Sequence, residues 1–282
     1  MSSNDNYLLG RTAEELHRLA RQAALIEPET EDLFRRSGIS AGMNVLEIGS
    51  GAGDVAMLVG RIVGPIGSVL GIERSADSAT LATERVAAAG NLPVRFEVAD
   101  LDSYTPRGRY DALVGRFVLP YLADPSATLR HLASYLNPGG VVAFLEFDVT
   151  KICSVPEGPL FRKVSDWMTK AFSDKINPSL GSALGSVFHD AGLPWPQMMS
   201  FQKVCCGPDG FYWLLAETTR AVLPHIVRLG LAASDEVDID TLEARLREEA
   251  VVRRLTVFSP RWVSAWTKLP RHPASGIKAI RT

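Results

Sequence analysis

Three closely spaced glycines follow a short apolar segment, and their spacing suits a ligand that lies against the backbone. Gly49, Gly51 and Gly53 come directly after the apolar run over 45–48, which predicts a buried strand. Glycine lets the chain turn tightly and lets a ligand approach the backbone closely. Apolar residues recur at helical spacing over 54–63, and the free N–H groups at the start of such a helix suit an anion. The stretch predicts a nucleotide-like cofactor on the first strand–helix unit of a parallel sheet.

Two acidic residues and one basic residue mark the ends of later apolar runs. Glu73 lies about 20 residues after the glycines, where a carboxylate can accept hydrogen bonds from both ribose hydroxyls. Asp100 ends the third run, where a short acid can accept a bond from an adenine amino group. Arg116 follows the fourth run. Open α/β sheets bind ligands at the carboxyl ends of their strands, so we expect these side chains to border one site.

Apolar runs and turn residues alternate between residues 44 and 147. They predict strands at 44–48, 68–73, 94–99, 110–115 and 141–147, and helices at 54–63, 75–89 and 125–136. Two more strands are expected at 198–206 and 256–268. Strands that alternate with helices favour parallel pairing with right-handed crossovers. The sequence therefore predicts an α/β fold with a Rossmann-like sheet.

Helical patterns lie on both sides of this alternating region. Thr12-x-x-Glu15 matches a capping box and predicts a helix over 12–26 that ends at Pro28. A second short helix is expected over 30–37. Beyond the alternating region, helices are expected at 160–174, 184–191, 209–229 and 241–254. These segments are the candidates for covering the site.

Bulk composition disfavours several classes of function. The chain has 282 residues and a formal net charge of −2, which argues against a dominant role on nucleic acid or on a membrane surface. The sequence has no apolar run near the roughly 20 residues of a membrane helix, and residues 1–6 lack a signal-peptide pattern. Three cysteines and five histidines show no disulfide or metal-ligand spacing, so we expect a cytoplasmic protein without a metal.

Five segments together resemble the ordered motifs of class I S-adenosylmethionine-dependent methyltransferases. They are residues 45–54, 71–73, 99–100, 110–114 and 137–140. A dinucleotide-binding turn has its third glycine at the position of Asp54, so the early Gly53 favours S-adenosyl-L-methionine as the cofactor. Residues 7–15 resemble the N-terminal lid of a bacterial subgroup related to quinone-ring and natural-product methyltransferases. The resemblance covers residues 40–150 closely.

The resemblance also implies a domain arrangement. The sheet would be seven-stranded and mostly parallel, with its last strand antiparallel. Residues 1–38 would form a helical lid and residues 39–282 the methyltransferase domain. Inserts at 148–178 and 207–255 would cap the substrate.

Each matching residue takes an implied role from the resemblance. The glycines let the backbone pass under the methionine part of the cofactor, and Glu47 orients that turn through the cofactor ammonium. Glu73 binds the ribose and Asp100 the adenine amine, while Arg74 lies along the adenine. Arg116 departs from the small or polar residue that is often found at its position. The full cofactor-binding set is Tyr7, Gln22, Glu47, Gly49, Ser50, Gly51, Gly53, Glu73, Arg74, Asp100, Leu101, Arg116 and Phe117.

These features favour methyl transfer to a small, apolar or aromatic acceptor in secondary metabolism. Carbon, nitrogen and oxygen acceptors stay open, as does the choice between a monomer and a homodimer. Glu146 is a candidate general base and Tyr121 a candidate hydrogen-bonding partner of the substrate, although either can be a structural residue. Two alternatives also stay open: a nicotinamide-dependent oxidoreductase and a catalytically silent protein that binds S-adenosylmethionine.

Overall fold

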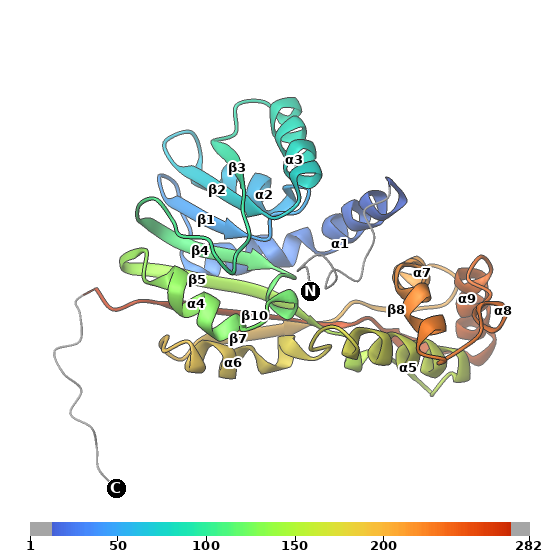
Figure 1. Cartoon of the computed structure of the whole chain (residues 1–282). Coiled ribbons are helices and arrows are strands. Elements are labelled where there is room, and N and C mark those ends of the chain that lie inside the picture. Colours follow the sequence, from blue (N-terminus) through green and yellow to red (C-terminus); the bar gives the residue numbers. More distant parts are fainter. Residues whose placement is uncertain (1–12, 272–282) are drawn as a thin grey trace, which may run out of the picture.

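A seven-stranded sheet forms the centre of the computed structural model, which describes residues 13–271 (Figure 1). Its strands are β1 (Asn44–Ile48), β2 (Ser68–Glu73), β3 (Val94–Val98), β4 (Tyr110–Arg116), β5 (Leu136–Asp148), β7 (Gln197–Phe201) and β10 (Arg261–Lys268). Their order is β3-β2-β1-β4-β5-β10-β7. The first five strands pair in parallel, and β10 runs antiparallel to both β5 and β7. The expected Rossmann-like α/β fold is confirmed.

Helices cover both faces of the sheet because successive strand residues point to opposite sides. Val45 packs into the core under α1 (Ala13–Ser37) and α2 (Asp54–Val63). Its neighbour Leu46 packs into the opposite core, under α4 (Pro125–Ala133) and α6 (Leu180–Asp190). α3 (Ala76–Ala89) follows β2 and contacts β2 and β3. The two cores hold β1, β2 and β4 rigidly, so their carboxyl ends meet at one edge.

The first helix is continuous, and the predicted break at Pro28 was wrong. α1 runs through Pro28, although proline removes the hydrogen bond to the carbonyl four residues earlier, here Ala24. Ala24 and Pro28 are both exposed, so water can satisfy that carbonyl. Beyond the proline, Leu33 and Phe34 are fully buried. Burial of one continuous apolar face therefore outweighs the roughly 3 kcal/mol that a proline costs inside a helix.

Two predicted strands divide, and their far halves form a second sheet that the sequence reading did not anticipate. The segment over 198–206 splits into β7 and β8 (Val204–Cys206), and that over 256–268 into β9 (Thr256–Phe258) and β10. β9 pairs antiparallel with β8 and with β6 (Cys153–Val155). The break falls at Ser259 and Pro260, where Ser259 Oγ accepts a hydrogen bond from Lys203 N at 3.0 Å. Proline has no N–H to continue a ladder, which fits the division.

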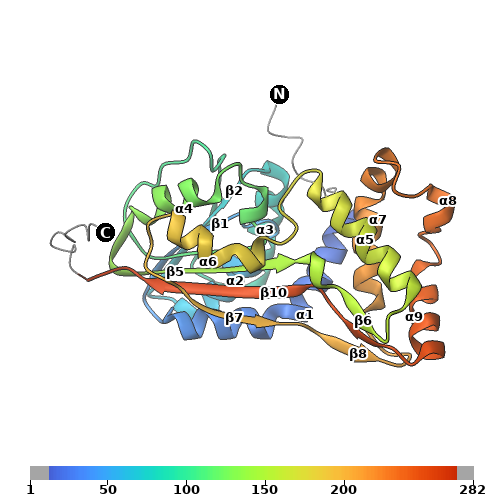
Figure 2. The same ribbon diagram turned by 90° about the horizontal axis from the view of Figure 1, so that it is seen from below.

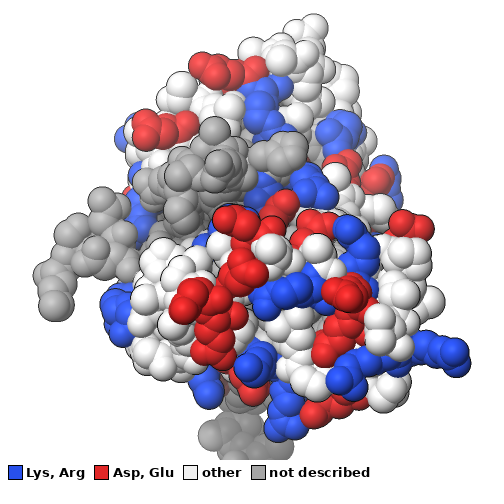
Figure 3. All heavy atoms as spheres, turned by 90° about the vertical axis from the view of Figure 1, so that its right-hand side faces the viewer, with Lys and Arg blue, Asp and Glu red and all other residues white. Residues whose placement is uncertain are grey.

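A group of helices lies beyond the second sheet, at the carboxyl end of the central strands (Figures 1 and 2). It comprises α5 (Pro159–Ser173), α7 (Tyr212–Arg228), α8 (Ser234–Val237) and α9 (Leu242–Arg253). Short 3-10 turns at Leu119–Tyr121 and Val149–Lys151 follow β4 and β5. The outer face of this end carries interspersed acidic and basic side chains (Figure 3). Lys163 and Glu236, for example, pair at 3.3 Å, as on a solvated surface.

Within residues 13–271, the helices are all too short or too polar to cross a membrane.

Candidate functional site

A cavity of about 290 Å³ lies at the carboxyl edge of the central sheet, under α1 and against α5 and α7. Its sheet wall comes from the strand ends and the loops after them, and includes Glu47, Gly49, Ser50, Gly51, Asp54, Glu73, Arg74, Asp100, Leu101, Arg116, Phe117 and Tyr121. Its helical wall comes from α1, α5 and α7: Arg18, Leu19, Gln22, Ala23, Ile26, Met168, Phe172, Leu214, Leu215 and Thr218. The volume is at the lower end of the range for small-molecule sites.

The glycine turn after β1 has a shape that side chains would destroy. Gly49 has a φ of 68°, and a Cβ there would lie 2.4 Å from Cγ2 of Val118. Gly51 has a φ of 51°, and a Cβ there would meet no atom of the described residues within 4 Å. Gly49 is therefore required for packing, whereas Gly51 leaves backbone open to the cavity. The turn provides a cradle that a flat or extended ligand part can enter.

Glu73 holds this cradle in place. Its Oε2 accepts a hydrogen bond from Gly51 N at 2.9 Å, and its Oε1 accepts one from Ser75 N at 2.8 Å. A carboxylate has about four acceptor positions, so it can bind the turn and ligand hydroxyls together. Asp100 lies at the end of the next strand, where Oδ1 accepts a bond from Asp102 N at 3.1 Å.

Glu47 brings a carboxylate with an unsatisfied oxygen into the sheet wall. The residue is only 1% exposed, and its Oε2 has no hydrogen-bond partner within residues 13–271. Burial raises the pKa of Glu47 to about 8, although a hydrogen bond with Ser50 and the charge of Arg116 oppose the shift. A buried polar atom without a partner is costly. A cationic ligand group beside Glu47 would remove that cost.

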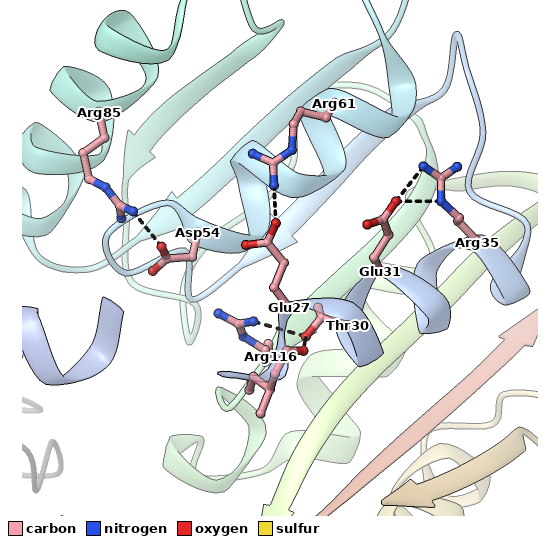
Figure 4. A network of polar contacts seen from close by, with 9 residues as sticks. Glu27, Thr30, Glu31, Arg35, Asp54, Arg61, Arg85 and Arg116 are labelled. Carbon is pink, nitrogen blue, oxygen red and sulfur yellow. Dashed lines mark hydrogen bonds and ion pairs between the residues drawn. The ribbon is translucent and has the colours of Figure 1, made fainter. Parts of the chain in front are cut away.

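Arg116 lies in the same wall and connects it to α1 (Figure 4). Its Nη1 donates a hydrogen bond to Thr30 Oγ1 at 3.2 Å, and Thr30 Oγ1 donates to the carbonyl of Ile26 at 2.7 Å. Burial lowers the pKa of Arg116, and the carboxylates of Asp54 and Glu47 oppose this. The positive charge of Arg116 thus interacts with the carboxyl group of Glu47 across the sheet wall.

Asp54 occupies the position of the third glycine in a dinucleotide-binding turn, and here it forms an ion pair. Its Oδ1 lies 2.7 Å from Nη2 of Arg85 on α3, and Arg85 Nη1 donates to the carbonyl of Ala52 at 2.5 Å. Glu27 and Arg61 pair nearby at 2.7 Å and fasten α1 to α2 (Figure 4). These contacts fix the helices around the cradle.

The turn after β4 has a strained backbone and is held by hydrogen bonds to residues of β5. Phe117 has a φ of 57°, which is uncommon for a bulky residue, and its N–H donates to Leu145 O at 3.0 Å. Glu146 Oε1 accepts hydrogen bonds from Val118 N at 3.2 Å and Leu119 N at 3.1 Å. Glu146 is fully buried, and burial raises its pKa to about 8. It supports the turn and is not among the residues that line the cavity.

The structure brings most of the predicted site together. Of the fifteen candidates, Tyr7 lies outside the described residues, while Gly53 and Glu146 lie near the cavity without lining it. The sequence motifs did not point to Arg18, Met168, Leu214, Leu215 or Thr218, which also line the cavity. No motif marks such residues, since α7 reaches the cavity only through tertiary packing. The helical spacing of Leu214, Leu215 and Thr218 is the one local signal that they share a face.

A family model for a methyltransferase domain matches residues 13–194, which is more than half of the chain. The chain belongs to this methyltransferase family. The identification as a class I S-adenosylmethionine-dependent methyltransferase is confirmed, and S-adenosyl-L-methionine is the cofactor of the family. The unsatisfied Glu47 and the open cradle at Gly51 fit such a cofactor, which carries an ammonium group and an extended amino-acid part.

Known relatives cover part of the chain. The ubiquinone/menaquinone biosynthesis C-methyltransferase UbiE of Pseudomonas putida is 31% identical over 140 residues, 48% of this chain and 52% of the relative. The protein of that name from Hahella chejuensis is 29% identical over 149 residues, 52% of this chain and 56% of the relative. The chain therefore spans about half the length of the curated relatives it matches.

Solved structures show the same fold at low identity. A putative methyltransferase from Bacillus halodurans has a TM-score of 0.57 and 13% identity, covering 86% of this chain and 99% of its own. Phosphoethanolamine N-methyltransferase 2 from Haemonchus contortus has a TM-score of 0.53 and 16% identity, covering 86% of this chain and 52% of its own. These likenesses confirm the seven-stranded methyltransferase fold.

Proposed function

We propose that the protein transfers a methyl group from S-adenosyl-L-methionine to a small, largely apolar or aromatic acceptor. The observation that carries this proposal is the contrast between the two walls of one cavity. Within the described residues, all five acidic residues that line the cavity and two of its three arginines belong to the sheet wall, whereas seven of the ten residues in the helical wall are apolar. A polar half suits a charged cofactor, and an apolar half suits an acceptor that must be kept from water.

The sheet wall would hold the cofactor. Glu73 would accept hydrogen bonds from the ribose hydroxyls, and Asp100 would accept one from the adenine amino group. The unsatisfied oxygen of Glu47 would accept the α-ammonium, and Arg116 would bind the adjacent carboxylate. The remaining members of the proposed set are Tyr7, Gln22, Ser50, Leu101, Arg74, Phe117 and the three glycines of the turn.

The protein would contribute to catalysis by aligning the acceptor with the methyl group and by excluding water from the cavity. A bound S-adenosylmethionine supplies a methyl group already activated by its sulfonium, so the acceptor needs mainly in-line placement and a dry site. Phe147 and Phe172, whose rings lie 5.9 Å apart, line the cavity with other apolar side chains. We propose that residues 1–38 act as a lid, and that the inserts at 148–178 and 207–255 cap the acceptor.

Two residues remain candidates for direct chemical roles. Tyr121 lies in the cavity wall, where its phenol would reach an acceptor oxygen or nitrogen. Glu146 would act as a base only if the Phe117 turn moved, because the carboxylate lies behind that turn. Full turnover by a Glu146→Gln variant would exclude the base role. The names of the relatives, C-methyltransferases of ubiquinone and menaquinone biosynthesis, support a small acceptor of this kind, in secondary metabolism or elsewhere.

Two measurements test the proposal in sequence. S-adenosylhomocysteine should bind and stabilise the purified protein, whereas NADH should not. Methyl-labelled S-adenosylmethionine with a small-molecule extract of the producing cell should then give a labelled low-mass product. Mass detection of that product would show whether carbon, nitrogen or oxygen is methylated. Binding without any labelled product would instead support a silent cofactor-binding protein.

A further inference from the structure

The polar side chains of the helical wall form one cluster. Arg18 Nη1 donates hydrogen bonds to Gln22 Oε1 at 2.7 Å and to Thr218 Oγ1 at 3.4 Å. Arg18 is only 3% exposed, yet it lines the cavity. The other side chains that α1, α5 and α7 contribute to the cavity within the described residues are apolar. A single polar point in an apolar wall is how small-molecule sites fix the orientation of a ligand.

The cluster is built to hold one guanidinium in one place. Gln22 lies one helical turn after Arg18 on α1 and accepts a hydrogen bond from it. Thr218 lies one helical turn beyond Leu214 and Leu215 on α7, so the hydroxyl and the apolar wall share a helix face. A guanidinium carries five N–H donors in a planar fork and can serve protein and ligand oxygens together. Its bonds to anionic oxygens are shorter and roughly twice as strong as neutral ones.

Arginines line both walls, Arg74 and Arg116 in the sheet wall and Arg18 in the helical wall, which bears on what each one binds. Arg116 lies beside Glu47 in the sheet wall, so these two residues together match the carboxylate and ammonium of the cofactor's amino-acid end. Arg18 contacts α7, the helix that contributes Leu214 and Leu215 to the cavity. Its position therefore suits the ligand that the helical wall encloses.

We infer that Arg18, positioned by Gln22 and Thr218, binds an anionic oxygen of the methyl acceptor. The acceptor would be an apolar or aromatic body that carries a carboxylate, phenolate or enolate. This inference rests on the proposed function, since it assumes that the helical wall holds the acceptor. It makes Arg18 a specificity-determining residue for the substrate.

The test uses matched probes, because the natural acceptor is unidentified. Protein saturated with S-adenosylhomocysteine is titrated with one-, two- and three-ring aromatic carboxylates and acidic phenols, each beside its neutral carboxamide or methyl ether. At least one anion should bind the unaltered protein about tenfold or more tightly than its neutral partner, the effect of a charged hydrogen bond. Arg18→Met should abolish that preference, and Thr218→Val should weaken it by a smaller factor.

Arg21 provides a matched control on the same helix. It also connects α1 to α7, through Glu217 at 2.8 Å and through stacking on Trp213 at 3.9 Å, but it does not line the cavity. Arg21→Met should keep the preference for anions. If Arg18→Met fails to fold, Arg18→Lys keeps a positive charge without the planar fork, and it should retain only part of the preference.

The outcomes separate this inference from the proposed function. Absence of any anion preference in the unaltered protein, or an undiminished preference in the folded Arg18 variants, would overturn the inference. A loss of affinity for S-adenosylhomocysteine in Arg18→Met, with unchanged affinity for 5′-methylthioadenosine, would overturn it too, because Arg18 would then hold the donor's carboxylate. Failure of the unaltered protein to bind S-adenosylhomocysteine would instead refute the proposed function.

Discussion

The two walls of the cavity are built in different ways. The sheet wall is assembled from short local motifs, such as the glycine turn and the acids at strand ends, and its parts are fixed by hydrogen bonds such as Glu73 to Gly51. The helical wall is assembled from helices far apart in the chain, α1 and α7, which meet at Arg18 and Thr218. The difference predicts that changes in the sheet wall affect the cofactor, and that changes in the helical wall, with the exception of Gln22, affect the acceptor.

The largest effect is expected at the glycine turn. Gly49→Ala would place a Cβ 2.4 Å from Val118 at a φ of 68°. The left-handed conformation costs roughly 1–2 kcal/mol, and overpacking adds about 1–3 kcal/mol. We expect a loss of about 2–5 kcal/mol in unfolding free energy, measured by urea denaturation, together with a loss of cofactor affinity.

Gly230→Ala is the control for this change. Gly230 has a similar φ of 64° at the end of α7, where Leu231 N donates to Ile226 O at 3.0 Å. A Cβ there meets no described atom within 4 Å, and the residue is not in the cavity wall. It should lose only the conformational part and keep its affinity for S-adenosylhomocysteine. Equal losses in both variants would contradict the packing role of Gly49.

A change in the helical wall should separate stability from cofactor binding. Leu215 is fully buried and lines the cavity, so Leu215→Ala should lower unfolding free energy by about 2–5 kcal/mol. Affinity for S-adenosylhomocysteine, measured by calorimetry, should stay within about threefold of the unaltered value. A large loss of that affinity would show that the two walls do not divide the ligands as described.

A change at Glu73 in the sheet wall should instead reduce cofactor affinity. Glu73→Ala removes the proposed ribose acceptor, and we expect a loss of about 1.5–3 kcal/mol in cofactor affinity, as for a hydrogen bond to a charged group. Calorimetry with S-adenosylhomocysteine measures it, and Glu84→Ala serves as a control on an exposed acid of α3. Unchanged affinity in Glu73→Ala would refute the ribose assignment.

The smallest expected effect is the release of a proton from Glu47 when the cofactor binds. The pKa of Glu47 is raised to about 8, so at pH 6–7 its carboxyl is mostly protonated in the free protein. An ammonium bound beside it favours the ionised form, so cofactor binding should release up to about one proton there and progressively fewer as the pH rises past 8. Calorimetry in buffers of different ionisation enthalpy counts that proton. Glu47→Gln should release none, and an unchanged release in that variant would assign the proton elsewhere.

The same difference explains what the sequence could predict. The predicted bounds of β1, β2 and α2 agree with the structure to the residue, because buried runs and glycine turns are local signals. The continuity of α1 through Pro28 was not predicted, because burial on the sheet outweighs a local helix breaker. The second sheet was not predicted because its three-residue strands, such as β9, carry too little periodicity. Arg18 was missed because its role depends on a contact with Thr218, 200 residues away.

Formation of a methylated product would show most directly that this cavity carries out methyl transfer. The purified protein is incubated with methyl-labelled S-adenosylmethionine and a small-molecule extract of the producing cell, beside the Glu73→Ala variant at the same subsaturating cofactor concentration. We predict a labelled low-mass product that forms more slowly with the variant. Tight binding of S-adenosylhomocysteine without a labelled product in any extract would contradict methyl transfer as the function of this cavity.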